Sequence, residues 1–299
     1  MNKKITVVIV TFNGENWIEK NINSILTSDY PISILVIDNK STDNTLAILS
    51  QFPAVEIIKS QHNLGFGKAN NIGIQYAFKN KSDAVFLLNQ DTRIFKNTIS
   101  SLVAVLKQNT NLGIISPMHF SGDNETLDAN FKTYLKSGIK NSNNTIVVPF
   151  VNAAAWLVSK ECFEKVGFFE PIFNHYGEDR NYCNRVIYHG FDIGIDEKSK
   201  IIHDRAITRN LKKDTLQSRY VILNSFLNIN NSFLKSSFVG LKSVFGLPKY
   251  FLKFYGWNKV LLLLLHLVGY FTILILHLKL ILKIRKNTKL NFSEISEDQ

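Results

Sequence analysis

Cysteine is scarce in this chain, with only Cys162 and Cys183 among 299 residues. Neither cysteine belongs to a C-x-x-C motif or to the cysteine and histidine spacing of a structural zinc site. Two isolated cysteines also give no sign of a disulfide framework, which is rare in reducing compartments. We therefore expect two free thiols, a reducing compartment and no zinc site.

Acidic residues are few in the last third of the chain. Residues 205–299 contain 15 Lys and Arg but only 4 Asp and Glu, whereas residues 1–204 contain 20 of each kind. The net charge of +11 therefore lies in the tail. Proteins that bind nucleic acid carry their basic residues along a groove, so this distribution argues against a nucleic-acid partner. It suits an anionic membrane surface, to which each basic residue contributes about 1 kcal/mol.

The basic tail brackets the most apolar segment, VLLLLLHLVGYFTILILHL, which spans residues 260–278. These 19 residues contain no Lys, Arg, Asp or Glu, and a membrane-spanning helix needs about 20 apolar residues. A buried core helix is the alternative, but the apolar residues occupy all faces. We expect this segment to contact a membrane, either as a single span or as an interfacial helix.

We expect no signal peptide at the N-terminus, although Lys3 and Lys4 precede an apolar run. The run ITVVIV is short and β-branched, and it leads into TFNG rather than into a small-residue cleavage site. It predicts a buried strand over residues 5–10.

Strand and helix patterns alternate over the first ninety residues. Further apolar runs predict strands over residues 33–38, 55–59 and 84–89. The segments between the strands show helical spacing over residues 15–27, 42–49 and 64–78. Repeated strand–helix–strand units with short connections predict a parallel sheet covered by helices on both faces.

A polar segment follows each predicted strand. Ligands bind at the carboxyl ends of the strands in such sheets. We therefore expect one polar mouth formed by residues 11–13, 38–39, 61–63 and 89–91.

Beyond residue 110 the periodicity weakens. Residues 121–145 predict a long loop or a short insertion, and residues 149–159 form an apolar stretch before a helix at 160–166. A loop then presents Glu178 and Asp179 at the start of a helix that ends near Gly190, and residues 192–203 suggest short strands.

Glycine at positions 65 and 67 does not make a dinucleotide-binding fingerprint. The third glycine is missing, and the segment follows the third strand rather than the first. A nucleotidyltransferase would need a Gly-rich loop with Arg or Lys after the first strand, which TFNG does not supply.

Several segments in this order resemble the family 2 glycosyltransferases of the GT-A fold, especially the rhamnosyltransferase-like members that build bacterial surface polysaccharides. They are VVIVTFNG (7–14), VIDNKSTDNT (36–45), NLGFGKANNIGI (63–74), LLNQDT (87–92), NAAAWLVSKECFEKVGFFEP (152–171), GED (177–179) and the late His203. The resemblance implies an α/β GT-A domain over residues 1–210 and a nucleotide-sugar donor. The basic and apolar composition of residues 211–299 predicts a helical, membrane-associating region and a location at the cytoplasmic face of the bacterial inner membrane.

The resemblance assigns donor binding to the polar mouth. Asp38 would accept a hydrogen bond from the N3–H of uracil or thymine, although Asp38 also suits a turn. Thr11 and Asn13 would line the base and diphosphate, or simply cap the next helix. The remaining donor-binding candidates are Asn63, Gly65, Asn70, Asn89 and Asp91.

A divalent cation is the cofactor that the resemblance implies. Asp91 holds the last position of a D-x-D-type motif, and His203 matches a late second ligand, with a lone histidine at a strand end as its alternative. Carboxylate ligands suit Mg²⁺ or Mn²⁺, and an imidazole ligand favours Mn²⁺ slightly. Asn89 replaces the Asp that many members carry, so we expect it to contact the ribose.

The acceptor hydroxyl must lose its proton as it attacks the sugar. The resemblance makes Asp179 the general base, with Glu178 orienting the acceptor or the loop. One base and direct attack would invert the anomeric centre. Both acids also suit a helix N-terminus electrostatically. Trp156 fits either a sugar contact or the core.

The sequence thus predicts an inverting, metal-dependent transfer of a sugar, rhamnose-type by preference, from a UDP- or dTDP-sugar to a glycan acceptor. The basic and apolar tail predicts that this acceptor is lipid-linked. A catalytically silent, membrane-bound binding subunit remains an alternative, because Asn89 departs from the metal motif. The nucleotidyltransferase is the second alternative.

Overall fold

The computed structural model describes residues 3–140, 145–205 and 209–292. Within these residues one 10-stranded sheet has the order β3-β2-β1-β4-β9-β6-β10-β8-β7, and β5 pairs with β10. The strands are β1 (Ile5–Thr11), β2 (Ile32–Asp38), β3 (Val55–Lys59), β4 (Ala84–Asn89), β5 (Thr92–Ile94), β6 (Leu112–Phe120), β7 (Ile139–Lys140), β8 (Thr145–Val147), β9 (Ala155–Ser159) and β10 (Asp192–His203).

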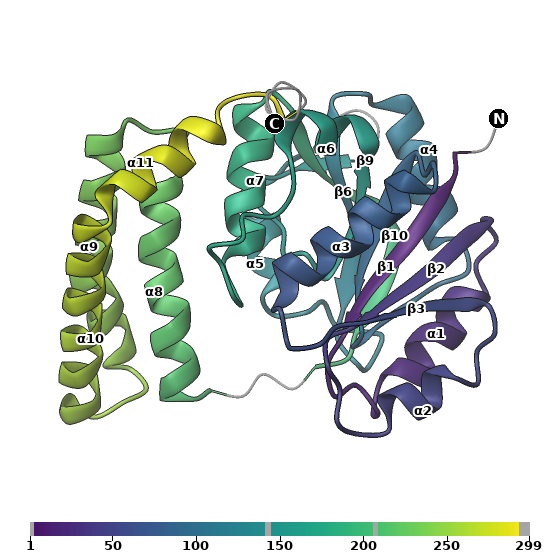
Figure 1. Ribbon diagram of the computed structural model, residues 1–299, viewed down its shortest axis with the longest axis horizontal. Coiled ribbons are helices and arrows are strands. Elements are labelled where there is room, and N and C mark those ends of the chain that lie inside the picture. Colours follow the sequence, from purple (N-terminus) through teal and green to yellow (C-terminus); the bar gives the residue numbers. More distant parts are fainter. Residues whose placement is uncertain (1–2, 141–144, 206–208, 293–299) are drawn as a thin grey trace.

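Helices cover both faces of the sheet (Figure 1). They are α1 (Ile18–Leu26), α2 (Thr45–Leu49), α3 (Phe66–Lys79), α4 (Thr98–Gln108), α5 (Phe131–Leu135), α6 (Lys160–Val166) and α7 (Glu178–Tyr188). The buried residues of α3, α6 and α7 join one hydrophobic cluster with Val8 and Leu35 of the sheet. Those of α1, α2 and α4 join a second cluster with Val7 and Ile9. Alternate residues of β1 thus enter opposite cores, which explains its uninterrupted apolar run.

The parallel arrangement of the first four strands is confirmed. β1 pairs in parallel with β2 and β4, and β2 pairs in parallel with β3. β9 runs antiparallel between β4 and β6, so the sheet is mixed but mostly parallel.

Several predicted boundaries were wrong. Helix α1 begins at Ile18 rather than at residue 15, and α2 begins at Thr45 rather than at residue 42. The residues before α2 form a loop in which Asp43 Oδ1 accepts the Thr45 backbone N–H at 3.0 Å. The two short strands expected over 192–203 form one strand, β10, with a register irregularity between Asp196 and Lys200. The segment 121–145, expected to be a long loop or a short insertion, contains α5, β7 and the first residue of β8. Its residues 141–144 lie outside the described part.

A helical unit follows the sheet and consists of α8 (Leu211–Leu227), α9 (Phe233–Phe251), α10 (Trp257–Leu276) and α11 (Leu278–Asn287). It has its own hydrophobic cluster, which includes Leu223, Phe226 and Leu267 and extends to Phe173 in the loop before α7. Figure 1 shows α8 between the α/β part and the outer pair of α9 and α10. The tail is therefore packed against the body of the protein along α8.

By length and composition, α10 is the helix within the described residues that is apolar enough to cross a membrane. It begins three residues before the apolar segment predicted from the sequence and ends at Leu276. The two cysteines are free and buried, as expected.

Candidate active site

The loops after β1 and β2 are tied together at the carboxyl edge of the sheet. Thr11 lies opposite Asp38 in the register of the two strands. Asn13 has a φ of 48°, and its side-chain oxygen accepts a hydrogen bond from the Thr42 backbone N–H at 2.9 Å. Both carboxylate oxygens of Asp38 lie 3.3 Å from the backbone nitrogen of Ser41. Three of the predicted donor-binding residues therefore belong to one connected pair of loops.

Gln90 links the end of β4 to the first of these loops. Its Oε1 accepts hydrogen bonds from the Thr11 hydroxyl at 2.6 Å and from the Phe12 backbone N–H at 3.0 Å. A Cβ at Gly14 would lie 2.5 Å from the same oxygen. Gln90 thus fixes the position of Thr11 relative to Asn89 and Asp91, a role that the sequence did not reveal.

Asn63 and Gly65 form the next part of the mouth. The Asn63 side-chain oxygen accepts hydrogen bonds from Asn39 Nδ2 at 3.0 Å and from the Gly65 backbone N–H at 2.9 Å. Gly65 has a φ of 78°, and a Cβ there would lie 1.6 Å from the carbonyl oxygen of Asn174. Glycine is therefore required at position 65 because the backbone of Asn174, and not a ligand, lies so close to it.

The two asparagines of α3 have different surroundings. Asn70 is buried, and its side-chain amide donates to the Phe66 carbonyl at 3.0 Å. Asn71 exchanges two hydrogen bonds of 2.9 Å with the backbone of Phe169. Asn71 therefore joins α3 to the segment before α7, and the assignment of Asn70 to the donor stays a prediction.

Trp156 belongs to the core. Its side chain is fully buried on β9, and its ring stacks on Phe169 with centroids 6.3 Å apart. Tyr182 of α7 contacts the same two rings. Of the two roles that the sequence left open for Trp156, the structure favours core packing.

Asp91 and His203 lie side by side. The antiparallel pairing of β10 with β5 places His203 opposite Thr92, next to Asp91. His203 Nε2 is 3.4 Å from Asp91 Oδ1, and neither atom has a hydrogen-bond partner within the described part of the chain. The Asp91 carbonyl accepts the Asp204 backbone N–H at 2.8 Å. This bond and the strand pairing hold the two side chains together.

Asp128 lies on the other side of the His203 ring. Its Oδ2 is 3.9 Å from His203 Nδ1, and both carboxylate oxygens pair with the Arg205 guanidinium. A carboxylate beyond the second ring nitrogen is the usual arrangement around a metal-binding histidine. The sequence placed Asp128 in a loop, so only the fold could identify it.

The Asp91–His203 pair fits a divalent cation. It offers one carboxylate oxygen and one imidazole nitrogen, both buried and without a hydrogen-bond partner, which is a donor set that Mn²⁺ accepts. Among residues 3–140, 145–205 and 209–292, no group of three or more His, Cys, Asp or Glu side chains is arranged so that it could hold a metal ion by itself. A cation held here would need further ligands from a bound substrate or from water.

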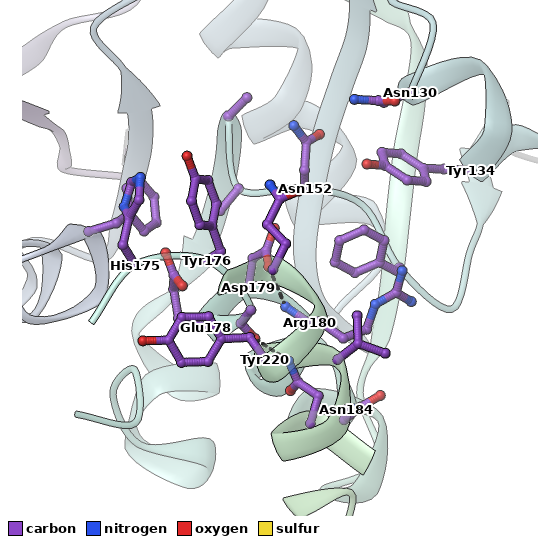
Figure 2. A pocket seen from close by; sticks show the side chains of 18 of the residues that line it. Asn130, Tyr134, Asn152, His175, Tyr176, Glu178, Asp179, Arg180, Asn184 and Tyr220 are labelled. Atoms are coloured by element: carbon purple, nitrogen blue, oxygen red, sulfur yellow. Dashed lines mark hydrogen bonds between the residues drawn. The ribbon is translucent and has the colours of Figure 1, made fainter. Parts of the chain in front are cut away.

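A cleft of about 920 Å³ lies between the sheet and α8, a volume within the usual range for small-molecule sites. Asn89 lines it at the end of β4, and Glu178 and Asp179 line it at the start of α7. Figure 2 shows Asp179 in the middle, with Asn152 beside it, Tyr134 on one side and His175 on the other. Lys213, Gln217, Tyr220 and Asn224 of α8 form the opposite wall.

The two acidic residues of α7 have different environments. Gly177, at a φ of 88°, turns the chain so that Glu178 and Asp179 occupy the first turn of the helix. Burial, together with the charge of Asp179, raises the pKa of Glu178 to about 8. Burial also raises the pKa of Asp179, but the Arg180 backbone N–H, which donates to Oδ1 at 2.7 Å, lowers it. Glu178 is therefore mainly neutral at pH 7, and Asp179 is the better candidate base.

Cationic side chains surround these acids. The Arg180 guanidinium lies 3.4 Å from the centre of the Phe150 ring. Arg209 pairs with Asp214 at 3.1 Å, and Lys213 lies in the same wall. Burial and the negative charge of Asp179 raise the pKa of Tyr134 to about 12, so its hydroxyl stays protonated. The cleft thus suits a polar substrate with several hydroxyl groups.

The structure brings the predicted residues into two adjoining groups. One group follows the ends of β1, β2, β3, β4 and β10. The other lies at the start of α7 in the cleft. The sequence missed the residues that only the tertiary fold brings here, namely Asp128, Tyr134, Asn152, Arg180, Arg205 and Lys213. Of these, Asn152 stands inside a segment that carries the resemblance.

Proteins similar in sequence to this chain include named glycosyltransferases. The model of "Glycosyl transferase family 2" matches residues 6–167. The chain is 29% identical to the dTDP-rhamnosyl transferase RfbF of Shigella flexneri, over 68% of this chain and 70% of that protein. It is 23% identical to an N-acetylglucosaminyl-diphospho-decaprenol L-rhamnosyltransferase of Mycobacterium tuberculosis, over 69% and 78% respectively.

Solved structures show the same fold. TarS 1–349 of S. aureus in complex with UDP-GlcNAc gives a TM-score of 0.64 at 14% identity, covering 90% of this chain and 80% of that one. The mannosyltransferase PcManGT of Pyrobaculum calidifontis, in complex with GDP-Man and Mn²⁺, gives 0.60 at 13% identity, covering 92% and 88%. At such identities the likeness shows the fold alone, which is the GT-A fold.

Proposed function

Because the chain belongs to glycosyl transferase family 2, and is thus a glycosyltransferase, we propose that it moves a sugar from a UDP- or dTDP-sugar to a glycan acceptor with inversion at the anomeric carbon. A rhamnose-type donor is favoured, since the similar proteins include a dTDP-rhamnosyl transferase. The observation that carries the proposal is the pair of acids at the start of α7, in the cleft that also reaches Asn89 at the end of β4.

The donor would lie over the carboxyl ends of the strands. Asp38 would accept a hydrogen bond from the N3–H of uracil or thymine, a recognition that excludes cytosine because its N3 has no hydrogen. The diphosphate and ribose would contact the other predicted donor-binding residues, namely Thr11, Asn13, Asn63, Gly65, Asn70, Asn89 and Asp91. The connected loops support this placement, since hydrogen bonds within the protein already fix their geometry.

Asp91 and His203 would hold the divalent cation, Mn²⁺ or Mg²⁺. A cation there would supply positive charge to the departing nucleoside diphosphate. Asp128 would keep the His203 ring oriented from its far side. The imidazole ligand and the Mn²⁺ in the structure of PcManGT support Mn²⁺ as the first ion to test.

Asp179 would take the proton of the acceptor hydroxyl as its oxygen attacks the anomeric carbon. A carboxylate with a pKa raised by burial is a stronger base than an exposed one. Neutral Glu178 would donate a hydrogen bond, a role that orients the acceptor without competing for its proton. One base and one attack opposite to the leaving group give inversion.

The acceptor would be a lipid-linked glycan at the cytoplasmic face of the inner membrane. The exposed apolar residues of α10 and the basic tail support contact with an anionic membrane surface. The mycobacterial relative is named for an N-acetylglucosaminyl-diphospho-decaprenol acceptor, which supports a lipid carrier. We propose residues 1–210 as the transferase domain and residues 211–299 as the membrane-associating part; residues 293–299 lie outside the described structure.

The test is a donor panel. Purified protein is incubated with UDP- and dTDP-sugars, with Mn²⁺, Mg²⁺ or EDTA, and with soluble or lipid-linked acceptors. The proposal requires turnover of at least one donor, loss of turnover with EDTA, and preference for the lipid-linked acceptor. Equal turnover with a short soluble sugar would contradict the lipid-linked acceptor. If every donor binds but none is consumed, the protein is a binding subunit.

A further inference from the structure

The outer layer of the helical unit consists of α9 and α10. α8 lies between this layer and the α/β part (Figure 1). Four residues of α9, Ser236, Gly240, Val244 and Pro248, recur at every fourth position and are buried. This stripe packs inward, and Phe226 of α8 lies against Gly240, where an added Cβ would be 2.8 Å from its ring.

A second stripe of α9 is apolar and exposed. Leu234, Phe238, Leu241 and Phe245 follow one another at helical spacing, with exposed fractions of 81%, 56%, 41% and 59%. Monomeric soluble proteins rarely leave so continuous an apolar stripe exposed, and such patches mark binding surfaces.

Lysines flank this stripe along one side. Lys235, Lys242 and Lys249 are exposed and seven residues apart, so they project from the same side of α9. Within the described ranges none of the three makes an ion pair, and Lys242 Nζ lies 4.5 Å from the centre of the Phe238 ring. A row of cations beside an apolar stripe complements a surface that carries anionic groups above an apolar layer.

Helix α10 shows a similar division. Val260, Leu263, Leu267 and Leu274 are buried in the helical unit. Trp257, Leu261, Leu265 and Leu276 are exposed, with fractions of 76%, 56%, 60% and 77%. One side of α10 is thus held by α8 and α9, and the other is apolar and free.

The chain after α10 returns to the body of the protein. The buried Arg285 guanidinium of α11 donates to the carbonyls of Phe226 at 2.6 Å, Asn228 at 2.8 Å and Asn231 at 2.7 Å. Further on, His189 Nε2 of the α/β part lies 3.0 Å from the Thr288 carbonyl.

Phe292 also packs edge-on against Phe168 of the α/β part, with ring centroids 5.0 Å apart. If α10 crossed a bilayer, α11 and these contacts would have to lie on the opposite side from the transferase domain. Crossing would therefore break the Arg285, Thr288 and Phe292 contacts and expose the buried side of α10.

We propose that α9 and α10 bind the surface of an anionic bilayer side by side, embedded in one leaflet, and that α10 does not cross it. The inference rests on the proposed function only for the presence of a membrane-bound acceptor. Binding in this orientation uses the exposed apolar side chains and the lysines together, and it leaves every contact of α11 in place. Val239 of α9 lines the cleft, so the active site opens beside the membrane-binding layer.

Vesicle flotation without donor or acceptor tests the binding surface separately from transfer. The full-length protein is mixed with vesicles of phosphatidylcholine alone or with phosphatidylglycerol at one part in four. We expect flotation with the anionic vesicles only. The triple substitution Lys235→Gln, Lys242→Gln, Lys249→Gln should weaken binding about 100-fold, since each lysine contributes roughly a factor of five.

Two variants complete this test. Lys20→Gln, Lys107→Gln, Lys132→Gln removes three exposed lysines of the α/β part and should bind like the wild type. Leu234→Gln, Phe238→Gln, Phe245→Gln should abolish flotation, while circular dichroism and donor binding stay unchanged. Equal flotation by all variants, or by neutral and anionic vesicles, would overturn the proposal.

Labelling of single cysteines decides between lying on the membrane and crossing it. The native thiols are buried, so cysteine at Leu290→Cys or Lys107→Cys can be labelled selectively with an impermeant maleimide. In inverted inner-membrane vesicles from a bacterial host, both positions should react equally, and neither should react in right-side-out vesicles. Reaction of Leu290→Cys in right-side-out vesicles alone would show that α10 crosses the bilayer.

Discussion

His203 Nε2 lies 3.4 Å from Asp91 Oδ1, and the pairing of β10 with β5 holds the two side chains in place. Two buried ligand atoms without hydrogen-bond partners are costly unless a third group binds them. A divalent cation satisfies both atoms at once. The pair is therefore the place where we propose that the metal of the reaction binds.

Removing either ligand should weaken Mn²⁺ binding. We expect Asp91→Asn and His203→Gln each to raise the half-saturating Mn²⁺ concentration by more than about 10-fold, and Asp128→Asn to raise it by about 10-fold through misorientation of the ring. Electron paramagnetic resonance of free Mn²⁺ in the presence of UDP measures this without turnover. The matched controls Asp29→Asn and His266→Gln change exposed residues outside the polar mouth and should bind Mn²⁺ normally. Unchanged binding by His203→Gln would remove His203 from the site.

The two acids of α7 should respond differently to amide substitution. Asp179→Asn removes the base and should lower kcat by about 10²- to 10⁴-fold, with donor binding retained. Glu178→Gln replaces a carboxyl that is mainly neutral at pH 7 with a neutral amide, so it should keep most of the activity. Initial rates at saturating donor decide the matter. A larger loss with Glu178→Gln than with Asp179→Asn would exchange the two roles.

The stability of the protein should fall with rising pH because of Glu178. Its pKa is raised from 4.5 to about 8 in the folded state, so the folded protein holds a proton that the unfolded chain releases. The stabilisation is fully present below about pH 4.5 and is lost as pH rises through about 8. The loss is at most about 1.4 kcal/mol per pH unit in that window.

Urea denaturation at pH 5, 6, 7 and 8 measures this dependence. Glu178→Gln cannot titrate, so its free energy of unfolding should fall less between pH 5 and pH 8 than that of the wild type. Asp29→Asn, at an exposed position, should follow the wild type. Parallel curves for the wild type and Glu178→Gln would mean that Glu178 is already ionised at pH 5.

The first part of the fold could be predicted because its strands are buried on both faces. Such strands appear as continuous apolar runs, and the polar residues after them mark the carboxyl edge where Asp38, Asn89 and Asp91 lie. Local patterns could not reveal Asp128, because it stands in a polar segment whose structure depends on contacts with His203 and Arg205. The place of Asp128 in the site is therefore set by tertiary contacts and not by the local sequence.

The wall of the cleft was equally hidden from the sequence. The periodicity of α8 shows a helix but not its neighbour, and Lys213 and Tyr220 line the cleft only because α8 packs beside α7. The apolar run of α10 predicted membrane contact, either as a single span or as an interfacial helix. Its length could not show that the chain after it returns to the α/β part, where the Thr288 carbonyl lies 3.0 Å from His189 Nε2.

Glycine at position 65 should be indispensable for stability. Its φ of 78° disfavours any L side chain, and an added Cβ would lie 1.6 Å from the Asn174 carbonyl oxygen, a backbone atom that cannot move without displacing the loop before α7. We expect Gly65→Ala to lower the free energy of unfolding by more than about 2 kcal/mol. Gly246→Ala is the matched control, because Gly246 lies in α9 with open space around its Cβ position.

Alanine in a helix is about 1 kcal/mol more favourable than glycine, so Gly246→Ala should stabilise the protein slightly. Urea denaturation of the two variants and the wild type, followed by circular dichroism, gives the comparison. Because Gly65 adjoins Asn63 and Asn39, a folded fraction of Gly65→Ala should also bind UDP more weakly. Wild-type stability in Gly65→Ala would show that the Asn174 loop moves freely, and the close contact would then have no structural role.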